Sequence, residues 1–395
     1  MVWFKLLRKM AGVALAGLLL LTAAGCETLQ FYRQAAWGQW QIMSARQSVA
    51  HLLADSATAP ALSERLGLSR EILEFAQQQL GLEAEGRYST YVELDRTHVL
   101  WNVFAARPYS LADTQWCYPI VGCAPYRGYF DEQRAHRIAQ RYAEQGFETY
   151  VAGVPAYSTL GWFEDPLLST FVAWPKGDLA NLLMHELTHG RVWASGDASF
   201  NESLAEFVGL RGTQIWFTQR GEAEGWHAWH AQRQRWRAFR DFAVDAKAHL
   251  QEVYAGPVQR LEERKVNAFA GLQSCYEAHR GVLGGGRFDQ LMARHFNNAF
   301  LLSIGTYADW LPAFEHLFAQ AAEDWPRFWQ AVEELAAEDA SIREMRLTQL
   351  AQQYLAQERL AQQQRLAQQQ IAERADDGDP HQVNCEPFLS HRPYT

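Results

Sequence analysis

The sequence predicts an α+β fold, with a small sheet in the N-terminal half and a mainly helical C-terminal half. Short β-branched and aromatic runs, separated by Pro and Gly, lie between Tyr88 and Ala152 and are typical of strands. Residues 27–82, and most of the chain from Gly177 to about residue 375, have a helical pattern instead. With 48% apolar and 21% charged residues, the 395-residue chain can bury a sizeable core.

The first 26 residues have the pattern of a secretory signal peptide. The positive region at its start consists of Lys5, Arg8 and Lys9. The apolar run 11–21 that follows is too short for a comfortable membrane span. Small residues then precede Cys26, as in a bacterial lipobox, although Ala23 stands where Leu is more usual. We expect residues 1–25 to be removed and Cys26 to carry lipid; the alternative is an ordinary cleaved signal with an incidental Cys.

The expected location follows from this signal. Glu27, rather than Asp, follows the Cys, which favours transport onward to the outer membrane of a Gram-negative bacterium. The chain would then be lipid-anchored on the periplasmic side of the envelope without crossing the bilayer. The net charge of −9 gives no sign of the basic face that a nucleic-acid-binding protein needs, so we expect no nucleic-acid partner.

Two cysteines lie close together in the segment Cys117–Cys123. The periplasm permits disulfides, and the Pro and Gly between these residues suit a turn that brings the sulfurs together. We expect a local disulfide; the alternative is two buried thiols. The spacing does not match a zinc knuckle.

The elements are predicted in chain order from local patterns. Helices are expected over Leu29–Leu53 and from Leu62 to Leu80, where Gly81 ends the second. Three strands are then expected over 91–94, 99–104 and 114–118. A helix over 131–145 and a strand over 147–152 are expected after them. Residues 226–272 suit one or two long helices, and the Gln- and Ala-rich segment 347–375 suits a helical arm before an irregular tail.

The segment from His185 to His189 has the pattern His-Glu-x-x-His. On a helix, these two histidines lie one turn apart on the same face, so both imidazoles can bind one zinc ion. Glu186 is rotated by about 100° from its neighbour and can take a proton from a water molecule beside the metal. We expect Asp178 to cap this helix and Gly196 to mark its end. The alternative is an ordinary helix with two histidines.

A second acidic pair follows in the segment 197–207. Glu202 and Glu206 share a helix face, a pattern that resembles the glutamate-zincins. In that group the third zinc ligand is a Glu on a following helix, and a carboxylate four residues later supports a ligand histidine. The alternatives are a capping box from Ser199 to Glu202, and Asp197 as the third ligand. The metzincin pattern does not fit, because Val192 and Ser195 occupy its Gly and His positions.

The stretch from Cys26 to about residue 340 resembles the predicted aminopeptidase family of Gram-negative lipoproteins, a branch of the glutamate-zincins. The segments that carry the resemblance are 99–106, the Cys117–Cys123 loop with 126–130, 156–163, the zinc motif and 297–307. The resemblance implies a zincin-like catalytic domain over 86–345, after a helical segment over 26–85 and before an arm and tail over 346–395. Its implied cofactor is one zinc ion per chain, and its implied substrate is a peptide.

The resemblance also implies further site residues. A strand upstream of the metal helix lines the cleft in related folds, which makes Tyr157, Ser158 and Thr159 candidates for contact with the substrate backbone; packing alone is the alternative. Zinc peptidases commonly use a Tyr or His to stabilise the tetrahedral intermediate. The first candidate is Tyr307, with Tyr276 and His295 as rivals.

The expected function is zinc-dependent hydrolysis of peptide bonds, with Glu186 as the general base, by an aminopeptidase. An aminopeptidase needs a group that holds the substrate's terminal amine, and Glu164 or Asp165 is a candidate. The alternatives are an endopeptidase, an inactive relative without metal, and a non-catalytic envelope lipoprotein that acts as a binding or scaffold protein. The intact Glu186 argues against a non-catalytic role, because a structural metal site gains nothing from a general base.

Overall fold

A three-stranded antiparallel sheet forms the centre of the strand-rich half. The computed structural model describes residues 29–112, 114–118, 122–156, 164–304 and 310–372. In it, β3 (Leu100–Ala106) pairs with β6 (Arg127–Tyr129) on one side and β7 (Glu148–Val154) on the other. Successive side chains of a strand point to opposite faces. Trp101 and Val103 therefore join one hydrophobic cluster, and Phe104 and Ala106 join another.

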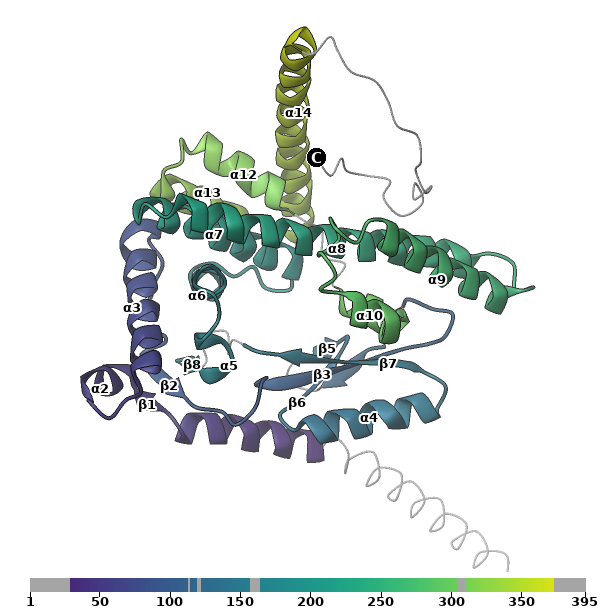
Figure 1. Cartoon of the computed structure of the whole chain (residues 1–395), viewed down its shortest axis with the longest axis horizontal. Helices are drawn as coiled ribbons and strands as arrows, with labels where there is room; N and C mark the ends of the chain where they lie inside the picture. Colours follow the sequence, from purple (N-terminus) through teal and green to yellow (C-terminus); the bar gives the residue numbers. More distant parts are fainter. Residues whose placement is uncertain (1–28, 113, 119–121, 157–163, 305–309, 373–395) are drawn as a thin grey trace, which may run out of the picture.

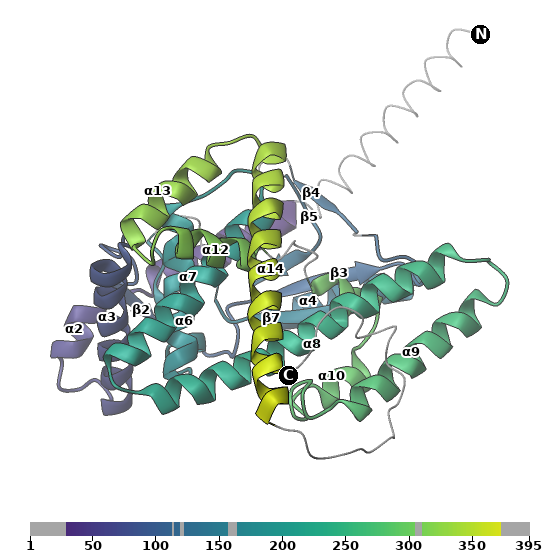
Figure 2. The same cartoon turned by 90° about the horizontal axis from the view of Figure 1, so that it is seen from above.

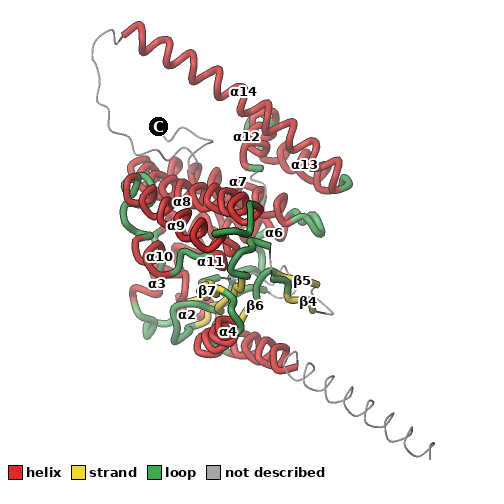
Figure 3. The backbone as a smooth tube through the Cα atoms, turned by 90° about the vertical axis from the view of Figure 1, so that its right-hand side faces the viewer, coloured by secondary structure: helices red, strands yellow, loops and turns green. Residues whose placement is uncertain are grey.

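Helices cover both faces of this sheet (Figure 1). α4 (Glu132–Glu144) packs on the Trp101 face through Ala135 and Ile138. The Phe104 face is covered by α11 (Asn298–Ser303), α8 (Ala223–Ala255), α9 (Leu261–Ala278) and α10 (Asp289–Arg294). Figure 3 shows the same order from the side, with α4 outermost beneath the strands. The helix expected over 131–145 is confirmed as α4, whose N-cap is Asp131.

The N-terminal segment differs from its prediction in one respect. The helix expected over Leu29–Leu53 is wrong as a single element, because helix 29–44 stops before β1 (Gln47–Ser48). Strand pairing breaks the helix there: Gln47 and Ser48 pair with β2 (Thr90–Val92), which in turn pairs with β8 (Leu167–Leu168). The Ser48 hydroxyl then caps α2 (Val49–Ala54).

The next helix agrees with its prediction. α3 (Pro60–Leu80) ends where Gly81 adopts a φ of +67°, the left-handed conformation that Gly reaches without strain.

The largest core surrounds α6 (Lys176–Arg191) and α7 (Ala198–Gln219). α3 packs against α6 on one side, and α7 packs against α12 (Leu311–Gln320) on the other. The phenyl rings between α7, α12 and α13 (Trp325–Ala336) are in edge-to-face and tilted contact: Phe200, Phe207, Phe314, Phe318 and Phe328. α5 (Ser169–Val172) immediately precedes this layer in the chain.

The long helices of the second half agree with the sequence. Residues 226–272 lie in α8 and α9, two helices packed against each other. The expected arm lies in α14 (Ala340–Ala372), which begins earlier than predicted and packs along α12 (Figure 2). The predicted boundary is late because the Gln- and Ala-rich composition starts only after the helix has begun.

A short hairpin carries the predicted disulfide. β4 (Trp116–Tyr118) pairs with β5 (Gly122–Ala124), and Cys117 lies directly opposite Cys123. The two sulfurs are bonded. Three other predictions lie outside the described residues: lipidation at Cys26, the substrate strand at Tyr157–Thr159, and the role of Tyr307. Among the described helices, none is long and apolar enough to cross a membrane.

Two glycines let α7 approach α6 closely. A Cβ atom at Gly209 would lie 3.0 Å from the backbone carbonyl oxygen of Asn181 in α6. At Gly212 it would lie 2.6 Å from the sulfur of Met184. The Cβ at Gly209 would also lie 2.7 Å from the side-chain nitrogen of Asn181, and a Cβ is essentially never found closer than 3.0 Å to another heavy atom, so Gly at these positions allows the close approach of the two helices.

Gly209→Ala is therefore expected to destabilise the protein by about 1–3 kcal/mol, because the added methyl group overpacks a helix interface. Gly67→Ala in α3 is the matched control, since a Cβ there meets nothing within 4 Å. That change is expected to stabilise the protein by about 0.5–1 kcal/mol through helix propensity. Urea unfolding measures both, and equal effects of the two variants would contradict this account of the interface.

Candidate metal centre

The histidine-bearing helix is α6, and both of its predicted boundaries need correction. Pro175 precedes the first turn, and no side chain caps it. Asp178 lies within that turn and instead accepts a hydrogen bond of 2.8 Å from the indole N–H of Trp229. The helix ends at Arg191 because Val192 is extended, whereas Gly196 lies in the following turn with a φ of +78°. The helix therefore begins and ends a few residues earlier than the sequence predicted.

His185 and His189 lie on one face of α6, one turn apart. Their Nε2 atoms are 3.2 Å apart, and the two rings are nearly perpendicular. His189 is buried, and the side chain of His185 is partly so. Both imidazoles therefore direct a nitrogen toward the same point.

Glu202 of α7 completes a cluster of three side chains. Its carboxylate oxygens lie 3.4 Å from His185 Nε2 and 3.7 Å from His189 Nε2. One donor atom from each residue lies within 4.8 Å of the other two. The Glu202 side chain is 47% exposed, so the cluster is open to solvent on this side.

These separations match what a small metal ion requires. The His–Glu distances exceed the usual N–H···O range of about 2.7–3.2 Å. Ligand atoms about 2.0–2.2 Å from a tetrahedral zinc ion lie roughly 3.4 Å from one another. Two imidazole nitrogens and a carboxylate oxygen are also donors that zinc accepts. The residues therefore fit the implied metal, with one side open.

The start of α7 positions Glu202, and its cap is not the one that a capping box would give. The N-cap is Asp197, whose carboxylate accepts from the N–H of Phe200 at 3.0 Å. The other Asp197 oxygen pairs with the buried Arg343 of α14 at 2.8 Å. Ser199 lies inside the first turn, so the alternative of a Ser199–Glu202 capping box is wrong. Asp197 is held by these two contacts and does not belong to the three-residue cluster.

Asn201 fixes the turn between the two helices, a role that the sequence did not predict. Its amide group accepts from the N–H of Ala194 and donates to the carbonyl oxygen of the same residue, both at 2.8 Å. Asn201 and Ala194 are almost fully buried. These two hydrogen bonds to the backbone of Ala194 hold the loop against Asn201, which immediately precedes Glu202. An Asn before the Glu does not by itself predict this contact, because a buried amide can serve many structural roles.

Glu206 makes a different contact from the one expected. Its carboxylate accepts a hydrogen bond of 2.6 Å from Arg233 of α8. Within the described part of the chain, Nδ1 of His189 is buried without a hydrogen-bond partner. Glu206 acts on His185 through its negative charge, which helps to raise the pKa of that imidazole.

The cluster is strongly coupled electrostatically. Burial and the neighbouring His185 lower the pKa of His189 to about 4, so this ring is neutral and able to bind a metal at neutral pH. Burial acts to lower the pKa of His185 as well, but Glu202, Glu186 and Glu206 outweigh it and raise the pKa. Burial acts to raise the pKa of Glu202, yet its contacts with both histidines lower it.

Glu186 shares this environment. Burial raises the pKa of its carboxyl group, and the charges of Glu202 and Asp165 raise it further against the opposing effect of His185. Of the two carboxylates considered for the substrate amine, Asp165 is therefore the one whose charge reaches Glu186. Glu164 is exposed, and its backbone carbonyl accepts from Arg46.

Two tyrosines near the cluster were not among the predicted residues. Burial raises the pKa of Tyr126, and the charge of Glu202 raises it further. Tyr88 is buried, and the charges of Glu186 and Asp165 add to the effect of burial in raising its pKa. Tyr88 also has a φ of +54°, which is unusual for a residue with a side chain. Its backbone N–H donates to the carbonyl oxygen of Asp165 at 3.0 Å.

The rivals of Tyr307 have other surroundings. Tyr276 is buried in the core of α8 and α9, and its hydroxyl donates to Asp289 at 2.8 Å. His295 follows α10, where its ring contacts Tyr150. Tyr276 is thus a core residue with a satisfied hydroxyl group.

The chain matches a known protein family. A family model described as "Putative aminopeptidase" matches residues 30–347, a span that includes the sheet, the metal cluster and the start of α14. No curated protein and no solved structure matches the chain.

Asn201→Ala is expected to destabilise the fold by about 1–3 kcal/mol, because it leaves the buried N–H and C=O of Ala194 without partners. Gln133→Ala, which removes an exposed amide on α4, is the control and is expected to change stability by less than about 0.5 kcal/mol. Urea unfolding is the measurement. If Asn201→Ala matched the control, the loop would not depend on this contact.

Proposed function

The chain belongs to the family described as "Putative aminopeptidase", and from this premise we propose that it is a zinc-dependent peptidase. The observation that carries the proposal is the convergence of His185, His189 and Glu202 at separations suited to one zinc ion. Glu186 lies on the same helix, next to the first of these residues. A metal site with a carboxylate beside it is what metal-assisted hydrolysis requires.

Each residue has a distinct role in the proposed reaction. His185, His189 and Glu202 would hold the metal. Zinc bound there supplies a Lewis acid that polarises the scissile carbonyl group and makes water a better nucleophile. Glu186 accepts the proton of the attacking water and later gives it to the leaving amine. The oxygen of that water becomes part of the new carboxylate, and the peptide C–N bond breaks.

The helices around the cluster support these roles physically. Asn201 and Asp197 fix the start of α7, so the backbone that carries Glu202 is positioned before a metal binds. Arg233 orients Glu206, which keeps a negative charge near His185. Such supporting contacts commonly contribute 10–100-fold to metal affinity, by order of magnitude.

Asp165 is the residue we assign to the α-amine of the substrate. Its charge helps to raise the pKa of both Glu186 and Tyr88, so it lies within electrostatic range of the general base. An ammonium group paired there would place the first peptide bond of a substrate near the base. The proposed cleavage from the amino terminus rests on the family description and on this assignment.

Glu186→Gln is expected to leave zinc binding intact and to lower kcat by at least about 10²-fold, because the amide cannot accept the proton. Glu334→Gln on α13, an exposed site, serves as the control and is expected to retain activity. A panel of aminoacyl and dipeptide substrates with free amino termini provides the assay, and zinc content is measured on the same samples. Full activity in Glu186→Gln would rule out the proposed mechanism.

Asp165→Asn is expected to raise KM for peptides with a free amino terminus by roughly 10–100-fold, because a charge-assisted contact is lost. Glu164→Gln is the matched control and is expected to have little effect. N-acetylated versions of the same peptides complete the design, since they lack the ammonium group. If wild type cleaved both peptide classes equally well, and Asp165→Asn affected them equally, the enzyme would be an endopeptidase instead.

A further inference from the structure

Helix 29–44 exposes apolar and aromatic side chains along one face. Leu29, Trp37 and Trp40 are 69%, 57% and 56% exposed. Arg33 is exposed as well, and each of the four residues follows the one before it by three or four positions, so they form one stripe. The indole rings of Trp37 and Trp40 stack on each other with centroids 4.8 Å apart. Apolar groups gathered on an exposed helix face commonly mark a contact surface.

The opposite face of this helix is fixed to the protein. The side-chain amide of Gln34 donates to the carbonyl oxygen of Gly128 and accepts from the N–H of Phe130, both at 3.2 Å. Gly38 lies against the ring of Phe130 so closely that a Cβ there would be 2.2 Å from it. Ile42 is 1% exposed. Because these contacts fix the rotation of the helix, the stripe with the two indoles must face outward.

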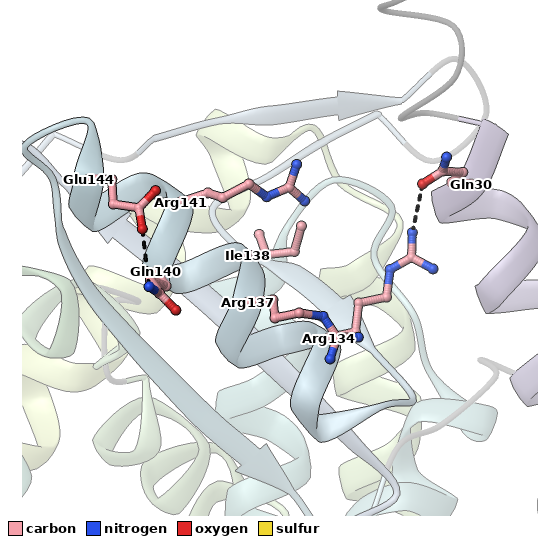
Figure 4. A pocket seen from close by; sticks show the side chains of 7 residues that line it. All are labelled: Gln30, Arg134, Arg137, Ile138, Gln140, Arg141 and Glu144. Atoms are coloured by element: carbon pink, nitrogen blue, oxygen red, sulfur yellow. Dashed lines mark hydrogen bonds between the residues drawn. The ribbon is translucent and has the colours of Figure 1, made fainter.

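A row of arginines on α4 continues this surface. Arg134, Arg137 and Arg141 are spaced by three and four residues and line an open pocket together with Gln30, which lies on the exposed side of helix 29–44 (Figure 4). Gln30 accepts a hydrogen bond of 3.4 Å from Arg134, so the row and the stripe are joined.

Exposed acidic groups stand at both ends of this row, with Asp131 and Glu132 before it and Glu144 after it. Asp131 lies 3.7 Å from Arg137, and Glu144 is hydrogen-bonded to Gln140 at 3.1 Å. Figure 1 shows helix 29–44 and α4 along the same edge of the molecule.

We propose that this edge docks on the surface of an anionic lipid bilayer. Trp and Leu suit the region between headgroups and acyl chains, and arginines suit phosphate groups above it. The sequence before the helix supports docking on a membrane. The expected lipid-bearing Cys26 follows the apolar run 11–21 and lies three residues before Leu29, where the stripe begins. A second copy of the chain fits this surface less well, because a symmetric dimer would bring the arginine rows of the two copies together and their positive charges would repel.

The consequence concerns orientation. A lipid anchor at Cys26 would fix one point of the chain to the membrane, and a second apolar or basic contact would fix the orientation of the domain. The stripe and the arginine row would supply that contact and would hold the protein with one edge against the lipid. The inference does not depend on the proposed zinc chemistry, because none of its residues belongs to the metal cluster.

Fluorescence quenching by brominated lipid tests the docking of the two tryptophans. The full chain is reconstituted into phosphatidylethanolamine–phosphatidylglycerol vesicles with bromine on the acyl chains, and tryptophan emission is compared with that in unbrominated vesicles. Wild type is expected to lose more emission than Trp37→Phe/Trp40→Phe, in which the two quenched indoles are absent. Trp236→Phe is the matched control, because Trp236 is 43% exposed on α8, and it is expected to lose as much emission as wild type.

Charge dependence tests the arginine row. Replacing phosphatidylglycerol by phosphatidylcholine, or introducing Arg134→Gln/Arg137→Gln/Arg141→Gln, is expected to reduce the quenching that depends on Trp37 and Trp40. Arg235→Gln, at an exposed position of α8, is expected to leave it unchanged. Circular dichroism establishes that each variant is folded, and the single variants Trp37→Phe and Trp40→Phe replace the double variant if it is not.

Three outcomes would overturn the proposal or its charged part. Equal quenching in wild type and Trp37→Phe/Trp40→Phe would show that the stripe does not meet acyl chains. Equal quenching together with a dimer in analytical ultracentrifugation would assign the stripe to a second copy of the chain. Quenching that is lost in the double variant but indifferent to lipid charge and to the arginine variants would remove the arginine row from the surface.

Discussion

The packing of α6 against α7 is the constraint on which the candidate site depends. The two histidines are on one helix and Glu202 is on the other, so their meeting depends on the separation and rotation of the pair. Gly209 sets the separation, and the bonds from Asn201 to Ala194 set the path of the turn between the helices. α3 and α12 pack on either side of this pair, and the aromatic core between α7, α12 and α13 keeps it from shifting. If the three residues bind a metal as proposed, the packing of the two helices would hold the ligand set together before the metal arrives.

Local signals in the sequence were sufficient for much of the fold. The helix over 131–145 and the end of α3 at Gly81 were predictable because a cap and a left-handed Gly act within a few residues. The face shared by His185 and His189 follows from helix geometry alone. Glu202 required a comparison with related folds, because no local rule says which carboxylate of a following helix meets a given histidine.

Features that depend on tertiary contacts were not predictable in this way. The break at 45–48 arises because Gln47 and Ser48 pair with a strand more than forty residues away. Asp197 caps α7 and also pairs with Arg343, almost 150 residues later, whereas the nearer Ser199 had suggested a different cap. The effect of the Asp165 charge on the pKa of Glu186 also depends on the fold, because the two residues are about twenty positions apart in the sequence.

The most direct test of the central claim is the metal content of the full chain, measured by elemental analysis after purification and supply of zinc. The account predicts about one zinc ion per chain in wild type, a large loss in His185→Ala and in Glu202→Ala, and retention in Asp197→Asn, in which the amide can still cap α7 and the ion pair with Arg343 is lost. Absence of zinc from wild type would contradict the account. So would tight zinc binding that persists in Glu202→Ala, because the two-helix ligand set would then be wrong.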